Sequence, residues 1–381
     1  MRLLALLAVV CGVVALPAPA MAAPNGWELA AMSVPAAQKI SKGAGVTVAV
    51  IDSGIRTDHA ALKGRATEGP DFLGENDQNA SYYGDHGTAM ASNVLDVAPA
   101  AKVLGLRASR DTEDPEFDSW LGSMRDENRK GGMAGAIQAA VKSGAQVISL
   151  SLGSELGIYS SEEAAVIAQA LAAGVVVVAS AGNEGDEVNE LSYPAAYPGV
   201  IAVGASTPQG RRATFSQVHN YVDVAAPGVE INAASIKGGR AKIQGTSPAG
   251  ALTAGVAALV VAKYPDLSPR QVEQVLQRTA STYRKGHNPQ TGYGVVNADA
   301  ALKAAARLKP ESAALPVGAQ GVGSHFGPGD DGTPAKIGQP WDAAYLVVGG
   351  ISAGIALFCL AVGLLLVLSG RRAAARTRPS P

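Results

Sequence analysis

Residues Gln146–Ser180 read QVISLSLGSELGIYSSEEAAVIAQALAAGVVVVAS, a strand, a helix and a second strand in succession. Gln146–Leu152 and Val175–Ser180 are apolar with little alternation, as in strands that are covered on both faces. Between them, Ser160 or Ser161 can cap a helix that has acidic residues in its first turn and ends at a glycine. A strand–helix–strand unit of this kind predicts a parallel sheet with right-handed crossovers.

The same alternation extends over most of the chain. Further strands are predicted at Val46–Ile51, Lys102–Leu106 and Val200–Ser206, and a further helix at residues 131–144. Arg107–Gly132 departs from the pattern because it is charged and has no apolar periodicity. We expect an α/β fold with a mainly parallel central sheet, and in Arg107–Gly132 a long solvated loop that could form the rim of a substrate site.

Composition narrows the class of protein. Of the 381 residues, 47% are hydrophobic, which is enough to build a substantial core. The chain has 31 basic and 32 acidic residues, so no overall positive field attracts nucleic acid. We therefore expect no nucleic-acid partner.

The N-terminus has the features of an export signal. An arginine precedes the apolar run Leu3–Leu16, and Ala20–Ala22 supplies the small-x-small pattern of a signal peptidase site. The alternative is an uncleaved anchor, but Pro17 and Pro19 suit a cleavage region better. We expect residues 1–22 to be a signal peptide.

The C-terminal region has the features of a membrane anchor. Tyr345–Leu368 is an uncharged apolar run of about 24 residues, about 36 Å as a helix, which exceeds the hydrocarbon core of a bilayer. Four arginines follow it, which places the C-terminus in the cytoplasm and the preceding domain outside. The predicted organisation is 1–22 signal peptide, 23–308 folded domain, 309–342 Pro/Gly-rich linker, 343–369 transmembrane helix and 370–381 cytoplasmic basic tail. We therefore expect a single-pass protein of the cell membrane with an extracytoplasmic domain.

The two cysteines limit the chemistry of that domain. Cys11 lies in the predicted signal peptide and Cys359 in the predicted transmembrane helix. The exported part therefore has no thiol and no disulfide, which excludes thiol catalysis and a cysteine metal site.

Two polar residues occupy positions that are typical of catalytic groups in parallel-sheet proteins. Asp52 ends an apolar strand, where such sheets place ligand-binding and catalytic side chains. A dinucleotide site is disfavoured because Gly43 and Gly45 precede the strand, whereas the glycines of that motif follow it. His86 begins a helical run, and we prefer Asp52 as its acid partner because neighbours in the chain, such as Asp85, rarely aim side chains at each other.

Two more residues extend this polar set. Asn183 follows a buried strand and a glycine, so its carboxamide can project from a turn and stabilise an oxyanion. Ser247 with Pro248 has the pattern of a helix N-cap, and taken alone it is more often a cap than a nucleophile. The remaining histidines are interpreted as structural or exposed; these are His59, His219, His287 and His325.

The chain order Asp52, His86, Ser247 is that of subtilisin among the three known orders of serine hydrolases. Seven stretches together resemble the subtilisin-like serine proteases, or subtilases: VAVIDSG, DHGTAMAS, VISLSLGS, VVVVASAGNEG, YPAAYPGVIAVGAS, VDVAAPGVEI and GTSPAGALTAGVAALV. The signal peptide, the lead-in GWELAAM, the tether and the single span with its arginines look like the mycosins, membrane-anchored subtilases associated with type VII secretion in actinobacteria. This resemblance implies a three-layer subtilisin-like fold and a serine endopeptidase that cleaves polypeptides.

The resemblance also implies roles for individual residues. Ser247 would be the nucleophile, His86 the general base and then acid, and Asp52 the group that orients the imidazole. Asn183 and the backbone N–H of Ser247 would form the oxyanion hole, next to the positive end of a helix. The implied substrate-binding residues are Ser151, Leu152 and Gly153, which would pair with the peptide backbone, and Ala181 and Gly182, which would line the specificity pocket.

The chain departs from the subtilase pattern at several points. Ala251 and Leu252 replace the usual Pro-His or Pro-Val pair, and proline stands at position 248 instead. A calcium-holding insertion is missing after His86, and Ala61 stands where an acidic ligand is common, so we expect no metal site and no cofactor. The segment before the first strand is too short for the usual folding propeptide, and the disulfides that the mycosin resemblance suggests cannot form.

Three hypotheses follow from these observations. The first is an active, membrane-tethered serine endopeptidase, and the second is a structural or assembly subunit of a secretion complex whose proteolysis is secondary. The third, an esterase with the same triad, is weaker because the strands that would hold a peptide are present.

Overall fold

The computed structural model describes residues 26–74, 77–123, 132–153, 158–281 and 286–311. All of them belong to one compact unit, residues 1–315. The predicted signal peptide, transmembrane helix, basic tail and almost all of the linker lie outside the described residues, as do both cysteines and His325.

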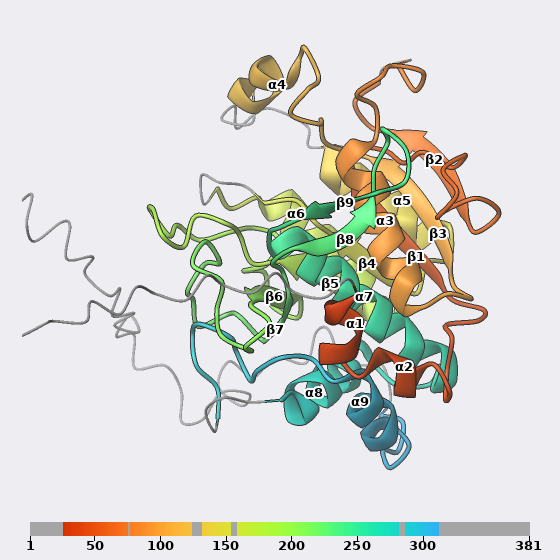
Figure 1. Ribbon diagram of the computed structural model, residues 1–381, viewed down its shortest axis with the longest axis vertical. Helices are drawn as coiled ribbons and strands as arrows, with labels where there is room; N and C mark the ends of the chain where they lie inside the picture. The colour runs from red at the N-terminus through yellow and green to blue at the C-terminus, as the bar shows by residue number, and fades with distance from the viewer. Residues whose placement is uncertain (1–25, 75–76, 124–131, 154–157, 282–285, 312–381) are drawn as a thin grey trace, which may run out of the picture. The chain divides into compact units, whose positions relative to one another are not determined.

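A seven-stranded parallel sheet organises the described residues (Figure 1). Its strands are β1 Thr47–Asp52, β2 Ala66–Asp71, β3 Lys102–Arg107, β4 Val147–Leu150, β5 Val176–Ser180, β6 Ile201–Ser206 and β7 Val224–Pro227. They are ordered β2-β3-β1-β4-β5-β6-β7, and every adjacent pair is parallel. Apart from it, β8 Ile231–Ala234 and β9 Arg240–Ile243 form an antiparallel pair. The predicted α/β fold with a mainly parallel sheet is confirmed.

The five predicted strands are all present, each with ends within two residues of the prediction. The prediction missed β2 and β7, both at the edges of the sheet, and also the separate pair β8 and β9. β2 has the sequence ATEGPD and is nowhere fully buried, so it has no apolar run to reveal it. β7 is only four residues long and reads VAAP, which is too short to show a period.

Helices cover both faces of the sheet. They are α1 Trp27–Ala31, α2 Val34–Ala37, α3 Asp85–Val97, α4 Phe117–Ser123, α5 Gly132–Lys142, α6 Ser161–Ala172, α7 Thr246–Lys263, α8 Pro269–Thr279 and α9 Ala298–Ala305. Alternate strand residues face opposite sides: Val48 and Val50 of β1 pack in a core with α3 and α7, whereas Ala49 and Ile51 pack in a second core with α5 and α6. The described residues therefore form three layers, with the sheet in the middle.

Helix caps predicted from the sequence are present. The Ser160 hydroxyl accepts a hydrogen bond from the Glu163 amide at 3.3 Å and caps α6. Ser268 and Gln271 form a reciprocal capping box at the start of α8, with distances of 3.2 and 3.1 Å.

The start of α7 differs from the prediction. Its N-cap is Gly245, with φ 143° and ψ 171°, so Ser247 is the second helical residue and not the cap. Thr246 opens the helix because its amide donates to the Asn183 side chain at 2.8 Å. Pro248 then occupies the third position, where a missing N–H costs nothing because the first four amides of a helix have no partner within it.

α7 is the one helix among the described residues that is long and apolar enough to cross a membrane. Most of it is buried in the domain, where it packs against strands β4 to β7. Its apolar composition is that of a core helix.

The close packing of α3 against α7 depends on a glycine. A Cβ atom at Gly255 would lie 2.7 Å from the Cβ of Val97 and 2.9 Å from the carbonyl oxygen of Val94. We predict that Gly255→Ala lowers the free energy of unfolding by roughly 1 to 3 kcal/mol, because the two helices must move apart. Urea denaturation measures this, with Gly122→Ala as the control, since Gly122 is exposed and has open space around it. Equal stabilities of the two variants would contradict the prediction.

Candidate active site

The predicted site residues meet at the carboxyl end of the sheet. From β1 the chain goes to β2 and β3 on one side of β1 and then crosses to β4 on the other side. Parallel sheets bind ligands at such a reversal of strand order. Asp52 ends β1, while Ser151 and Asn183 follow β4 and β5. His86 and Ser247 come from the first turns of α3 and α7, the two helices that pack tightly on one face.

Asp52 and His86 form a direct hydrogen bond. The Nδ1 atom of His86 lies 2.7 Å from Oδ1 of Asp52, which is 1% exposed, whereas the His86 side chain is 40% exposed. Since a carboxylate oxygen accepts hydrogen bonds, this contact places a proton on Nδ1, so that Nε2 can act as the base once the ring is neutral. Asp52 is therefore the acid partner of the histidine, as predicted.

The His86 ring is electrostatically biased toward its charged form. Burial lowers the pKa of His86, but the charge and hydrogen bond of Asp52, with the charges of Asp111 and Asp85, outweigh this and raise the pKa to about 9. The imidazolium is thus stabilised where catalysis creates it.

The start of α3 is pressed against the turn that follows Asp52. A Cβ atom at Gly87 would lie 2.0 Å from the carbonyl oxygen of Gly54, so only glycine fits there. The Gly87 amide donates to the Ser53 hydroxyl at 3.1 Å, and the Asp85 and His86 amides donate to the Asp111 carboxylate at 3.0 and 2.8 Å. These contacts fix the histidine backbone next to Asp52.

Asn183 is oriented by the residue before the serine. Its Oδ1 atom accepts hydrogen bonds from the amide and the hydroxyl of Thr246, at 2.8 and 3.0 Å. The Thr246 hydroxyl in turn accepts from the Gly182 amide at 3.2 Å. With its oxygen used in this way, the carboxamide presents its NH₂ group as a donor. Thr246 is fully buried and was not singled out from the sequence, although it stands next to Ser247.

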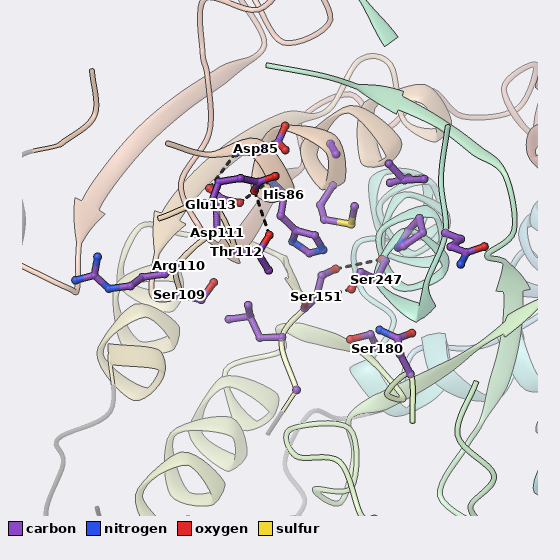
Figure 2. A pocket seen from close by; sticks show the side chains of 18 of the residues that line it. Asp85, His86, Ser109, Arg110, Asp111, Thr112, Glu113, Ser151, Ser180 and Ser247 are labelled. Carbon is purple, nitrogen blue, oxygen red and sulfur yellow. Dashed lines mark hydrogen bonds between the residues drawn. The ribbon is translucent and has the colours of Figure 1, made fainter. Parts of the chain in front are cut away.

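Ser247 is 9% exposed and lies on the wall of the cavity (Figure 2). Its hydroxyl donates to the backbone oxygen of Ser151 at 3.3 Å, and the Ser151 hydroxyl donates to the backbone oxygen of Ser247 at 3.1 Å. Among the described residues the Ser247 hydroxyl makes no hydrogen bond to His86; in the absence of substrate such catalytic hydrogen bonds are often long or poorly aligned.

A cavity of about 640 Å³ joins these groups. The predicted substrate residues Ser151, Leu152, Gly153 and Gly182 line it, together with His86, Asn183 and Ser247. Ala181 does not line the cavity: it is fully buried, and its backbone oxygen accepts a hydrogen bond from the Tyr221 hydroxyl at 3.3 Å. The strand β4 ends at Leu150, so the three residues from Ser151 extend along the cavity in non-strand conformation.

The described part of the segment Arg107–Gly132, residues 107–123, is less exposed than predicted. It lines the cavity with Ser109 and Asp111 and with the apolar side chains of α4, so it is a rim of the site. Arg107, Asp111 and Asp114 are nonetheless at most 5% exposed. Arg107 and Asp114 are buried as an ion pair, and the Asp111 carboxylate is buried against the backbone amides of α3, which composition alone cannot reveal.

The described histidines other than His86 bond to backbone groups. Nε2 of His59, His219 and His287 lies 3.1, 2.9 and 2.8 Å from the carbonyl oxygens of Gly239, Glu190 and Val222. Within the described part of the chain, no group of three or more His, Cys, Asp or Glu side chains is arranged to hold a metal ion.

A profile of the subtilase family matches residues 43–296. The chain belongs to the subtilase family. Alkaline elastase YaB from Bacillus sp. (strain YaB) is 36% identical to this subtilase over 278 residues, which are 73% of this chain and 70% of the elastase.

Solved structures of secretion-associated proteases are also similar. The MycP3 protease from the type VII (ESX-3) secretion system is 29% identical with a TM-score of 0.62, covering 73% of this chain and 88% of MycP3. MycP1 from Mycobacterium smegmatis is 27% identical with a TM-score of 0.59, covering 73% of this chain and 84% of MycP1.

This subtilase is therefore a subtilisin-like serine endopeptidase with polypeptide substrates. In the predicted mechanism, His86 removes the proton of Ser247, whose oxygen attacks the peptide carbonyl carbon. The carbonyl oxygen becomes an oxyanion that the Asn183 NH₂ group and the Ser247 amide can stabilise. His86 then donates its proton to the leaving amine, and water hydrolyses the acyl-enzyme by the same steps.

The pKa of His86 sets an expected pH dependence. The base must be neutral, and a raised pKa keeps it protonated to higher pH, so kcat/KM should rise with pH and level off only above about pH 9. Initial rates on a peptide substrate between pH 5 and pH 11 measure this. An ascending limb centred near the ordinary histidine value of 6.5 would contradict the prediction.

Proposed function

We propose that this subtilase is a membrane-anchored, extracytoplasmic endopeptidase that works with a type VII secretion system. The observation that carries the proposal is the similarity to MycP1 and MycP3, which extends over 84% and 88% of those chains. MycP3 is a protease from the type VII (ESX-3) secretion system. Two further features of the sequence agree with it: the N-terminal apolar run with its small-x-small site and the C-terminal apolar run followed by arginines.

The anchor and its topology can be tested in cells that produce the full-length protein. The protein should remain with the membrane fraction after a high-salt wash, and added protease should degrade the peptidase domain but spare a tag after Pro381. Removal of Tyr345–Leu368 should release an active enzyme. A soluble full-length protein, or a peptidase domain that resists added protease in intact cells, would contradict the topology.

The link to secretion can be tested by membrane proteomics of wild-type cells against cells with Ser247→Ala. We expect uncleaved precursors of secreted or membrane proteins to accumulate in the variant, and secretion components to co-purify with both proteins. If neither result is observed, the proposed association with secretion is wrong. The endopeptidase activity measured in vitro would not be affected by that result.

A second candidate function is that of a structural or assembly subunit whose proteolysis is secondary. It is motivated by the unusual start of α7, where Pro248 directly follows the serine. Normal secretion in Ser247→Ala cells, combined with loss of secretion when the whole chain is deleted, would favour it.

A further inference from the structure

Asp111 connects the two polypeptide segments that carry the catalytic acid and base. Its carboxylate is 5% exposed and accepts hydrogen bonds from the amides of Asp85 and His86, the first two residues of α3. The Ser53 hydroxyl, next to Asp52, is also bonded to it. Three residues before Asp111, the amide of Ala108 donates to the backbone oxygen of Asp52 at 2.9 Å. One segment therefore touches both sides of the Asp52–His86 pair.

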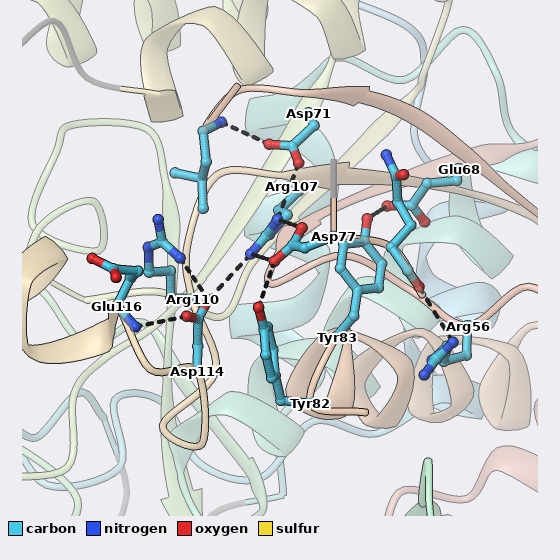
Figure 3. A network of polar contacts seen from close by, with 12 residues as sticks. Arg56, Glu68, Asp71, Asp77, Tyr82, Tyr83, Arg107, Arg110, Asp114 and Glu116 are labelled. Carbon is cyan, nitrogen blue, oxygen red and sulfur yellow. Dashed lines mark hydrogen bonds and ion pairs between the residues drawn. The ribbon is translucent and has the colours of Figure 1, made fainter. Parts of the chain in front are cut away.

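The turn that begins at Asp111 is joined to a buried charge network around Arg107 and Asp114, which Figure 3 shows. In this turn the Asp114 amide donates to the Asp111 backbone oxygen at 3.0 Å. The Asp114 carboxylate pairs with Arg110 at 2.7 Å and with Arg107 at 3.2 Å. Arg107 also pairs with Asp71 and Asp77 and lies 5.0 Å above the ring of Tyr83.

Burial of this kind is costly unless the groups have fixed partners, so the network restricts where the turn can lie. Arg107 is 1% exposed, and its three carboxylate partners come from two segments: Asp71 and Asp77 from the end of β2 and the residues after it, and Asp114 from the segment after β3. The position of the Asp111 carboxylate relative to α3 is therefore rigidly determined.

We propose that Asp111 is a positioning residue for the catalytic histidine, which fixes the His86 backbone against Asp52 and supplies a buried negative charge that stabilises the imidazolium. Two independent features support this. A carboxylate that accepts two adjacent amides sets the direction of the first turn of α3, from which the His86 side chain projects. It also opposes the positive end of the α3 dipole, which would otherwise disfavour a cation at that place.

Few charged groups contribute to the stabilisation of the His86 imidazolium. The charged groups that face the His86 ring are Asp52 at the end of β1, Asp111 after β3 and Asp85 on α3 itself. Ser151 and Ser247, on the β4 and α7 sides, are neutral. Burial raises the pKa of Asp111 to about 6, although the hydrogen bonds from the His86 amide and the Ser53 hydroxyl lower it. The carboxylate is therefore charged near pH 9, where the histidine titrates.

The test compares pH profiles of the full-length protein with Asp111→Asn and with Asp111→Glu. Asp111→Asn removes the charge and replaces one acceptor by a donor. The ascending limb of kcat/KM should move by about one pH unit to lower pH. The plateau of kcat should fall about 10- to 100-fold with little change in KM, because the misplaced histidine affects the chemical step. Asp111→Glu keeps the charge but is longer, so its limb should stay in place while the plateau falls.

Asp118→Asn is the matched control, since Asp118 is an exposed aspartate seven residues along the same segment, and neither limb nor plateau should move. A folded Asp111→Asn protein with lower thermal stability but an unchanged limb and plateau would overturn the proposal, because Asp111 would then serve stability alone. If Asp111→Asn does not fold, Asp111→Glu decides: an unchanged plateau would overturn the proposal equally.

Discussion

Ser247→Ala should lower kcat by about 10⁶-fold, the size of the loss when the nucleophile of subtilisin is removed. Without the hydroxyl there is no acyl-enzyme, and the remaining groups can only assist direct attack by water. The variant should fold normally because the Ser247 hydroxyl makes one long hydrogen bond, at 3.3 Å to Ser151. Single-turnover and steady-state rates on a peptide substrate measure the loss, and a fluorophosphonate reports the nucleophile directly by covalent labelling of the wild-type protein alone.

Ser268→Ala is a control for the capping role of serine. Ser268 caps α8 as part of a capping box, so its replacement should reduce stability by about 1 kcal/mol and leave kcat unchanged. Labelling of folded Ser247→Ala protein, or failure to label folded wild-type protein, would show that Ser247 is not the nucleophile. The comparison separates the two interpretations that a serine at a helix start allows.

Much of the site could be predicted because its residues stand at element ends. Asp52 ends an apolar strand, and His86 and Ser247 stand at the starts of helical runs, so their places follow from local patterns and from the rule that parallel sheets bind at their carboxyl edge. The central strands could also be predicted from a local pattern, because burial on both faces leaves a continuous apolar run.

The residues that support the site could not be predicted in the same way. Asp111 lies in a charged segment without a period, and its carboxylate is buried against the amides of Asp85 and His86, which are 26 and 25 residues away in the chain. The expectation that Ser247 would be the cap hid Thr246. The Asn183 side chain, 63 residues away in the chain, binds the Thr246 amide, and the helix begins two residues earlier than that expectation required. Long-range polar contacts leave no periodic trace in a sequence.

Asp52→Asn should lower kcat by about 10⁴-fold without removing any atom that touches the substrate. An asparagine can donate its NH₂ group to Nδ1 of His86, which then carries no proton there, and the ring proton moves to Nε2. This is the wrong tautomer, because Nε2 must accept the proton of Ser247. The 2.7 Å contact can persist, so the loss should appear in kcat with KM nearly unchanged.

The charge change adds a second signature to Asp52→Asn. Asp52 is the strongest of the groups that raise the pKa of His86, so its loss should move the ascending limb of the residual activity to lower pH. Asp58→Asn, an exposed aspartate in the segment after β1, should alter neither rate nor limb. A folded Asp52→Asn enzyme that keeps more than about a tenth of the wild-type kcat would show that the carboxylate does not set the tautomer, since that role requires a loss of several orders of magnitude.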